Sequence, residues 1–287
     1  MASAGKSIKE QAKNGSLIVT ILQYIVLIAG CLSVFVPLAV ILLGAFKDGK
    51  EFANSGVFDL PKSWSFENFR TAFFEGNVLL GLRNTAAILT ASCAGTILTG
   101  TMTAFVIQRF DGYFTRAVKG LFLLATLLPN ISMQVTVFQI VSKMGLYNTM
   151  LAPIILYVGT DIISIYIFMQ FLSQISVSLD ESAIMDGASY PRIYFSIILP
   201  NLMPAIATVL IIKFVSIYND FYTPQLYMQD ERLLVVSTVL YKYISSTKIQ
   251  WEVVFAGIIL CIIPTLLIFL FLQKYIYSGL VSGSVKE

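Results

Sequence analysis

The hydrophobic positions of this chain fall into long runs that are separated by shorter polar segments. Four of these runs carry no charged residue, and two more carry a single charge each. Every run is longer than the ~20 residues that an α-helix needs to cross the hydrocarbon core of a membrane. The runs cover residues 14–46, 84–108, 120–142, 144–179 (interrupted by Asp161), 193–219 (interrupted by Lys213) and 253–273.

Lipid offers backbone amides and carbonyls no hydrogen-bond partner, so runs of this length favour helices. The alternating pattern of an outer-membrane barrel is absent from the sequence. We therefore predict an all-α membrane protein with six transmembrane helices. The predicted spans are residues 17–45, 85–107, 118–141, 151–173, 202–219 and 253–274.

Composition supports this class and narrows the chemistry. Apolar residues make up 57 % of the chain and charged residues 12 %, which is far from the balance of an ordinary soluble domain. The chain contains no histidine, so histidine-based zinc sites and proton relays are excluded. Its three cysteines all lie inside apolar runs, where a thiol acts as a small packing residue. The net charge of +3 provides no basic stripe, and nucleic-acid binding is not indicated.

The ends of the chain predict its orientation and its organisation. Residues 1–16 are short and polar, and the apolar run behind them is too long for a cleaved signal, so a retained first span is expected. Lysines and arginines in short segments near the span ends favour a cytoplasmic N-terminus. Six spans then return the C-terminus to the same side. We expect a cytoplasmic segment over residues 1–16, a six-span transmembrane domain over residues 17–275 and a cytoplasmic tail over residues 276–287.

The polar loop at residues 178–200 has the pattern of two short helices joined by a glycine elbow. Ser178 and Glu181 are spaced as a capping box, which predicts a helix over residues 179–186. Gly187 is suited to end that helix in a left-handed conformation. Ser189 would cap a second helix, and Pro200 with Asn201 would break the chain before the next span.

This loop could be a docking surface or only a well-capped connector. Small residues would let the backbone of a partner approach closely, and Glu181 and Asp186 would offer carboxylates to its basic groups. Spacing alone does not decide between the two interpretations.

The loop residues also resemble a known signature. The stretch from Glu181 to Ala188 (E-S-A-x-x-D-G-A), followed by Tyr194-x-x-Ile-x-Leu-Pro200, is similar to the coupling loop of ABC importer permeases. It departs from the usual pattern at Ser182, where Ala is usual, and at Tyr194, where Phe is usual. Gly145-Leu-Tyr-Asn-Thr149 and Tyr218-Asn-Asp-Phe221 also resemble the carbohydrate-uptake members of that family.

The resemblance implies a type I importer permease fold, a bacterial-type cell membrane and a set of partners. These would be a second, homologous permease subunit, two ATPase subunits that bind ATP and Mg, and an extracytoplasmic solute-binding protein. The chain itself would hold no cofactor and would not be an enzyme. By motif position, Glu181 would make the main polar contact with an ATPase, Ala183 and Ala188 would permit close docking, and Gly187 would form the elbow. Asp186 and Pro200 complete the matching positions.

Polar residues inside the spans are candidates for the solute path. Counting ~1.5 Å per residue brings Asp161 and Lys213 to similar depths, although their spans run in opposite directions. A sugar path bordered by amides, a carboxylate and aromatic rings would use Asn130, Gln134, Asp161, Tyr166 and Asn219. Alternatively, Asp161 and Lys213 form a buried ion pair that only fixes helix packing, and the amides bond between helices.

Other functions remain as alternatives. They are an ABC permease for a non-sugar solute and an ion-coupled secondary transporter, although only one acid lies deep within a span. An intramembrane enzyme is disfavoured because the chain lacks histidine and its cysteines are isolated. Gly5-Lys6-Ser7 matches only the end of a phosphate-binding loop, so ATP would have to be bound by another chain.

Overall fold

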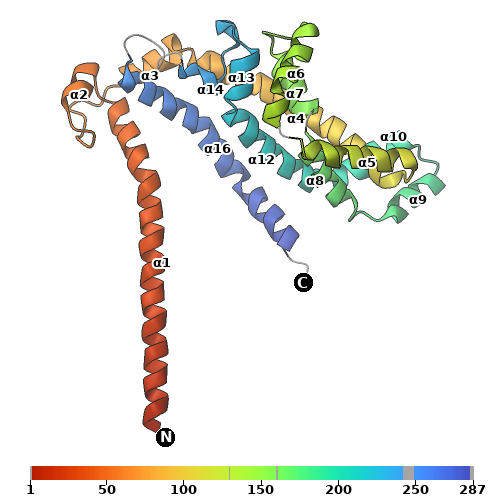
Figure 1. Ribbon diagram of the computed structural model, residues 1–287, viewed down its shortest axis with the longest axis horizontal. Coiled ribbons are helices and arrows are strands. Elements are labelled where there is room, and N and C mark those ends of the chain that lie inside the picture. Colours follow the sequence, from red (N-terminus) through yellow and green to blue (C-terminus); the bar gives the residue numbers. More distant parts are fainter. Residues whose placement is uncertain (1, 129, 160, 242–248, 285–287) are drawn as a thin grey trace.

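The computed structural model describes residues 2–128, 130–159, 161–241 and 249–284, and these residues form helices and no strand (Figure 1). Three helices run long and unbroken. They are α1 (Ala2–Ala45), α4 (Val78–Arg109) and α16 (Trp251–Ser284). The others are α2 (Gly49–Asn54), α3 (Glu67–Arg70), η1 (Thr71–Glu75), α5 (Tyr113–Thr126), α6 (Asn130–Lys143), α7 (Leu151–Gly159), α8 (Ile162–Leu172), α9 (Val177–Met185), α10 (Tyr190–Ile193), η2 (Tyr194–Ile198), α11 (Leu199–Asn201), α12 (Met203–Asn219), α13 (Tyr222–Tyr227), η3 (Glu231–Leu233) and α14 (Val236–Val239).

By length and composition, the described residues contain three to five candidate membrane spans. The three unbroken ones are Val19–Ala45, Val78–Arg109 and Trp251–Leu270. Two bent pairs qualify if each pair is one span. They are α7 with α8, bent by 42°, and Tyr190–Asn201 with α12, bent by 69°. The prediction of an all-α membrane fold is confirmed, and five of the six predicted spans coincide with these segments.

The third predicted span, 118–141, does not form one continuous helix. It is divided between α5, which ends at Thr126, and α6, which begins at Asn130. Proline follows Leu128 in the sequence, and a proline inside a helix removes a backbone donor and clashes with the preceding turn. Figure 1 shows α5 and α6 running in clearly different directions.

The predicted break at Pro200 and Asn201 lies slightly later in the structure. A π-helical turn over η2 lets the helix continue through Pro200, because Leu199 N–H reaches back to the carbonyl of Tyr194. The bend comes at Leu202, just before Pro204 in the first turn of α12. Pro200 therefore lies within the helical segment that precedes the bend and does not itself break it.

Helix α4 is the centre of the packed body, where it contacts α7, α8 and α12. The main core gathers Phe168, Leu172, Ile193 and Val209, all nearly or completely buried. Helix α4 approaches α8 closely at Gly100, where an added Cβ would lie 3.0 Å from the Phe168 ring. This core lies next to the polar loop, so the loop rests on a rigid base.

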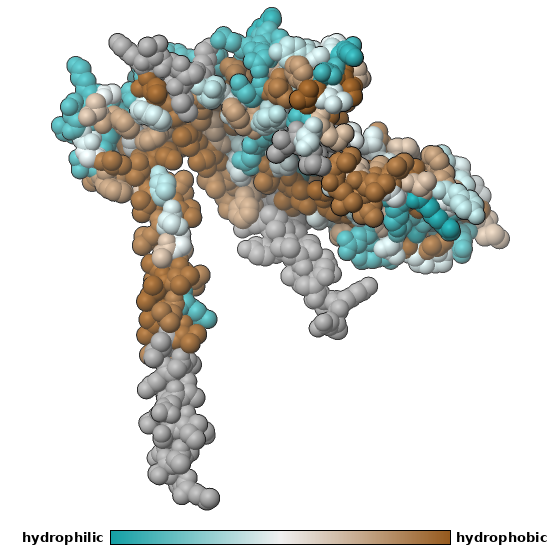
Figure 2. Space-filling model, viewed as in Figure 1, coloured by the Kyte–Doolittle hydropathy of each residue, from teal (hydrophilic) through white to brown (hydrophobic). Residues whose placement is uncertain are grey.

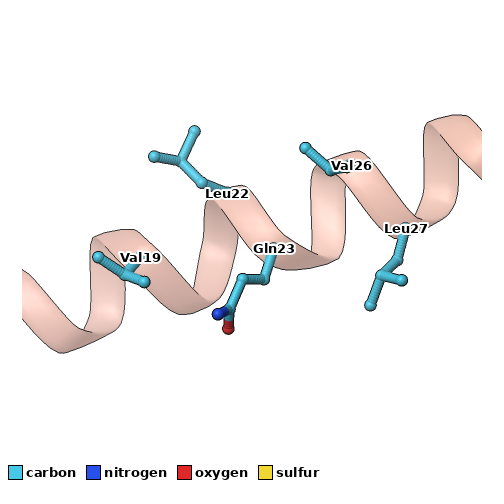
Figure 3. Close-up of a pocket in the computed structure, with 5 residues that line it drawn as sticks. All are labelled: Val19, Leu22, Gln23, Val26 and Leu27. Atoms are coloured by element: carbon cyan, nitrogen blue, oxygen red, sulfur yellow. The ribbon is translucent and has the colours of Figure 1, made fainter.

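Unlike α4, helix α1 lies mostly outside the packed body of the described chain. Its residues from 19 to 39 are all exposed, and the helix projects away from the body (Figures 1 and 2). It contacts the body at its C-terminal end, where Gly44 lies against the Phe255 ring of α16. The hollow along α1 is lined by Val19, Leu22, Gln23, Val26 and Leu27, all from this one helix (Figure 3). A hollow with no second wall does not enclose a solute. Its apolar surface suits lipid or another helix.

The helix of α1 begins at Ala2, so the predicted limit between residues 16 and 17 falls inside it. Likewise, α16 runs on to Ser284, past the predicted limit near residue 275. Residues 285–287 lie outside the described residues. The domain boundaries are therefore predictions about the membrane surface and not ends of helices.

Candidate functional site: the coupling loop and the broken spans

The first helix of the polar loop, α9, begins two residues earlier than predicted. Its N-cap is Ser176, which has an extended backbone and accepts a hydrogen bond from Ser178 N–H at 3.3 Å. Ser178 is already helical, and its hydroxyl lies 2.7 Å from that of Ser176. The predicted capping box between Ser178 and Glu181 is therefore wrong. Ser176 offers the same hydroxyl chemistry two residues closer to α8, and Glu181 is left exposed.

The C-terminal end of α9 matches the prediction. Gly187 has φ +79°, in the left-handed region where residues with a Cβ are strained. Its N–H donates to the carbonyl of Ile184 and the N–H of Ala188 donates to that of Ala183, both at 2.9 Å. This is the Schellman pattern that ends a helix and reverses its direction. Gly187 is confirmed as the elbow of the loop.

The second helix of the loop follows immediately. Ser189 stands at the N-cap position of α10, but its side chain makes no capping hydrogen bond, and Pro191 lies in the first turn. Tyr194, where the family signature usually has Phe, places its hydroxyl 2.6 Å from Thr101 Oγ1 in the buried interior. This contact fastens the second half of the loop to α4.

The candidate docking residues do not all face the same way. Glu181, Asp186, Gly187 and Pro200 are exposed and Ala188 is half-buried. Ala183 is buried in the main core of its own chain. Its small side chain therefore serves packing beneath the helix, and we correct the expectation that it lies open to a partner. The outward surface of α9 combines Glu181 with the exposed apolar side chain of Met185.

One residue of this loop was underestimated from the sequence. Asp180 is buried and its Oδ2 lies 2.6 Å from Arg109 Nε, at the C-terminal end of α4. Arg109 also donates from Nη2 to the carbonyl of Ile175, at 3.0 Å. In the sequence, Asp180 suggests only a favourable charge in the first turn of a helix. Nothing in the spacing pairs it with an arginine 71 positions earlier.

The break between α7 and α8 holds the second buried ion pair. Lys213 Nζ of α12 lies 2.9 Å from Asp161 Oδ2 and donates to the carbonyl of Tyr157 at 2.6 Å. Asp161 is the N-cap of α8 and its Oδ1 accepts from Ser164 N–H. The lysine thus lies at the carbonyl end of α7 and the aspartate at the amide end of α8. Each charge complements the dipole of the helix end that it meets.

The structure forms the ion pair that the packing alternative requires, and whether Asp161 also borders a solute path stays a prediction. Their similar depths were predicted by counting residues, and the structure brings them together. Helix α7 is joined to the C-terminal end of α12 as well, where Tyr157 OH donates to Asp220 Oδ2 at 2.8 Å.

The other candidate path residues lie in different places. Tyr166 of α8 packs against the main core, and Gln134 of α6 is half-buried. Asn219, at the end of α12, donates to the carbonyl of Val215 and borders an open groove with Phe221 and Ser237. Asn130 begins α6, and its side chain lies outside the described residues. The four candidates whose side chains are described come from α6, α8 and the end of α12, and a role in a solute path remains a prediction.

Buried helix packing, broken spans and a capped polar loop are features of a multi-pass membrane protein. The sequence matches the family described as "Binding-protein-dependent transport system inner membrane component" over residues 95–281. The chain belongs to this family. It is accordingly a multi-pass inner-membrane component of a transport system.

Curated relatives cover most of the chain. It is 28 % identical over 271 residues to the melibiose/raffinose/stachyose import permease protein MelC of Bacillus subtilis (strain 168), covering 94 % of this chain and 96 % of that protein. It is 29 % identical over 255 residues to the probable ABC transporter permease protein YurM of the same organism, covering 87 % and 83 %. Over 209 residues it is 30 % identical to the trehalose/maltose transport system permease protein MalG of Thermococcus litoralis, covering 71 % and 74 %.

Solved structures show the same fold. A chain of a bacterial ABC transporter involved in alginate import superposes with a TM-score of 0.81 at 19 % identity, covering 90 % of this chain and 96 % of that one. A chain of the MetNI methionine ABC transporter gives a TM-score of 0.52 at 17 % identity, covering 70 % and 95 %. The predicted ABC importer permease fold is confirmed.

Proposed function

We propose that this chain is one of two permease subunits of an ATP-driven importer for sugars or oligosaccharides. The observation that carries the proposal is the outward surface of α9, with Glu181 exposed on a helix that ends in the Gly187 elbow and is fixed to the core. An exposed acid on a rigid, well-capped helix suits a groove with basic groups on a partner protein. Membership of a binding-protein-dependent family supports an ATPase as that partner.

The rest of the assembly follows from the family. Two ATPase subunits bind ATP and Mg, and this chain binds neither. A homologous permease covers the apolar surface of α1 over residues 19–39, which no other described part of this chain buries. A solute-binding protein delivers the solute on the outer side. Both termini lie in the cytoplasm, where the short basic segments of the chain favour them.

The sugar assignment rests on relatives and on one groove. MelC and MalG carry names of oligosaccharide transport permeases. In this chain, the open groove beside Asn219 combines amide and hydroxyl groups with the aromatic side chains of Tyr218 and Phe221. Such a lining suits a molecule with hydroxyl groups and apolar C–H faces. The remaining candidates, Asn130, Gln134 and Tyr166, would border the path together with the second permease.

The experiment measures solute-stimulated ATP hydrolysis by the complex, purified with its neighbouring subunits in nanodiscs. Glu181→Lys should abolish stimulation by the binding protein loaded with sugar while the subunits stay assembled. Asp111→Lys makes the same charge change at an exposed position just before α5, outside the loop of residues 178–200, and serves as the control. Stimulation that survives Glu181→Lys would contradict the proposal. A panel of amino acids tested beside melibiose, raffinose, maltose and trehalose decides between a sugar and a non-sugar solute.

A further inference from the structure

The two adjacent acids of α9 face opposite directions. Glu181 is exposed, whereas Asp180 is buried, with only 9 % of its side chain accessible. Consecutive residues of a helix are separated by about 100° around its axis, so one acid can face a partner while its neighbour faces the body of the chain. The inward acid has no role in docking.

Asp180 is held by a single partner among the described residues. Its Oδ2 lies 2.6 Å from Arg109 Nε, and its Oδ1 is buried without a hydrogen-bond partner in the described part of the chain. A buried carboxylate of this kind is strongly destabilising unless an opposite charge compensates it. The position of α9 is therefore tied to the position of Arg109.

Arg109 connects three helices. It is the last residue of α4, which is the helix that packs against α7, α8 and α12. Its Nη2 donates to the carbonyl of Ile175, between α8 and α9, while Nε pairs with Asp180. Immediately before it, Gln108 donates to the carbonyl of Met169 in α8. In Figure 1, α5, α8, α9 and α10 gather at one end of the molecule.

From this geometry we propose that Arg109 and Asp180 are a positioning pair that transmits movement of α9 to α4. This inference rests on the proposed function, in which an ATPase moves α9. Arg109 holds the start of α9 at two points, through the ion pair with Asp180 and through the hydrogen bond from Nη2 to the carbonyl of Ile175, whereas an apolar contact allows sliding. The pair therefore makes α9 and the end of α4 move as one body.

The chain offers a matched control for this pair. Arg116 and Asp111 form the same kind of ion pair at the same 2.6 Å, a few residues after Arg109. Their side chains are exposed, by 67 % and 75 %, and both lie in one local segment around the start of α5. Replacing either side chain breaks an ion pair of equal length, but it does not disconnect two helices.

The first measurement is hydrogen–deuterium exchange of the assembled complex in nanodiscs without nucleotide. Asp180→Asn keeps the shape of the side chain and removes its charge. We expect faster exchange of the amides over residues 177–188, while Asp111→Asn leaves that segment unchanged. Exchange over 177–188 that is unaltered in Asp180→Asn would overturn the inference, whatever the solute or ATPase partner proves to be.

The second measurement is the amount of solute transported per ATP hydrolysed in proteoliposomes. The neutral pair Arg109→Met with Asp180→Leu removes both charges, so no buried charge is left unpaired and the complex should assemble. We expect its transport per ATP to fall by about tenfold, a size typical of coupling between sites. The exchanged pair Arg109→Glu with Asp180→Lys should recover part of that loss.

The outcomes separate this inference from the proposed function. If the neutral pair assembles and couples like the wild type, the ion pair only assists folding and the inference is wrong. If the wild-type complex itself shows no solute-stimulated ATP hydrolysis, the proposed function fails. The exchange measurement still decides whether Arg109 holds α9 in place.

Discussion

The described residues contain two buried ion pairs of similar geometry that lie in very different surroundings. Lys213 and Asp161 are 2.9 Å apart with 10 % of each side chain accessible, and Arg109 and Asp180 are 2.6 Å apart with 7 % and 9 % accessible. The first pair joins helices within the packed spans, at the break between α7 and α8. The second joins the end of a span to a polar loop.

The surroundings decide what the loss of each pair does. If Asp161 loses its partner, its charge stays enclosed by packed helices and the cost falls on the whole fold. If Asp180 loses its charge, α9 can lift away and Arg109 can regain water, so the cost is local. The comparison separates a pair that maintains the fold from one that positions a moving part.

The largest expected effect is on the first pair. Lys213→Met leaves Asp161 buried without a counter-ion, and removal of one partner from such a pair costs about 3–5 kcal/mol. We expect a clear fall in the unfolding temperature of the purified complex or loss of its assembly. The double variant Lys213→Met with Asp161→Leu should recover most of that stability. A stable Lys213→Met single variant would show that the two buried pairs do not differ as argued.

The second prediction concerns the elbow of the loop. Gly187→Ala places a Cβ on a residue with φ +79°, at a cost of about 1–2 kcal/mol. We expect this strain to distort the end of α9 and to lower solute-stimulated ATP hydrolysis, with little change in the unfolding temperature. Gly120→Ala is the matched control, because Gly120 lies in α5 with no atom within 4 Å of an added Cβ. Equal stimulation in both variants would show that the elbow geometry is dispensable.

A smaller effect is expected at Tyr194. Tyr194→Phe restores the usual family residue and removes the buried contact with Thr101 Oγ1. The loss of one buried hydrogen bond costs about 1 kcal/mol. Thermal unfolding of Tyr194→Phe, Thr101→Val and the double variant would measure the pairwise contribution. Strictly additive effects of the two substitutions would mean that the two hydroxyls do not interact.

The smallest effect is expected at the exposed control pair. Hydrogen bonds from Arg116 lower the pKa of Asp111 below its ordinary value of 3.8. A lowered pKa means that any stabilisation is present above the unfolded pKa and is lost only as the pH falls through the folded value. The carboxylate therefore stays ionised from pH 5 to pH 8, so the effect of Asp111→Asn should not vary over that interval, and it should be small because the pair is exposed. A measurable change in that interval would show that this exposed pair is more than a control.

The sequence predicted those features that depend on local chemistry. Apolar runs gave the helical membrane fold, and Gly187 at the end of a short polar helix gave the elbow. Residue counting placed Asp161 and Lys213 at similar depths, and the structure shows them paired. The sequence could not decide whether these two residues pair with each other, because pairing depends on which helices are neighbours.

The sequence failed where the outcome depends on competition or on distant contacts. Ser176 and Ser178 are equally good capping residues, and the end of α8 determines which of them caps α9. From its position in the sequence motif, Ala183 is expected to be open to a partner, but the structure buries it in the core. The pairing of Asp180 with Arg109 spans 71 positions of sequence, and no local pattern indicates it.

The central claim is that α9 couples an ATPase to the movement of the spans. Its most direct test is sugar uptake per ATP hydrolysed in proteoliposomes that contain the complete complex, compared between wild type and Glu181→Lys. The account predicts that Glu181→Lys retains its assembly and a basal hydrolysis rate but loses uptake. Uptake per ATP equal to that of the wild type would contradict it and would leave the loop as a connector between two spans.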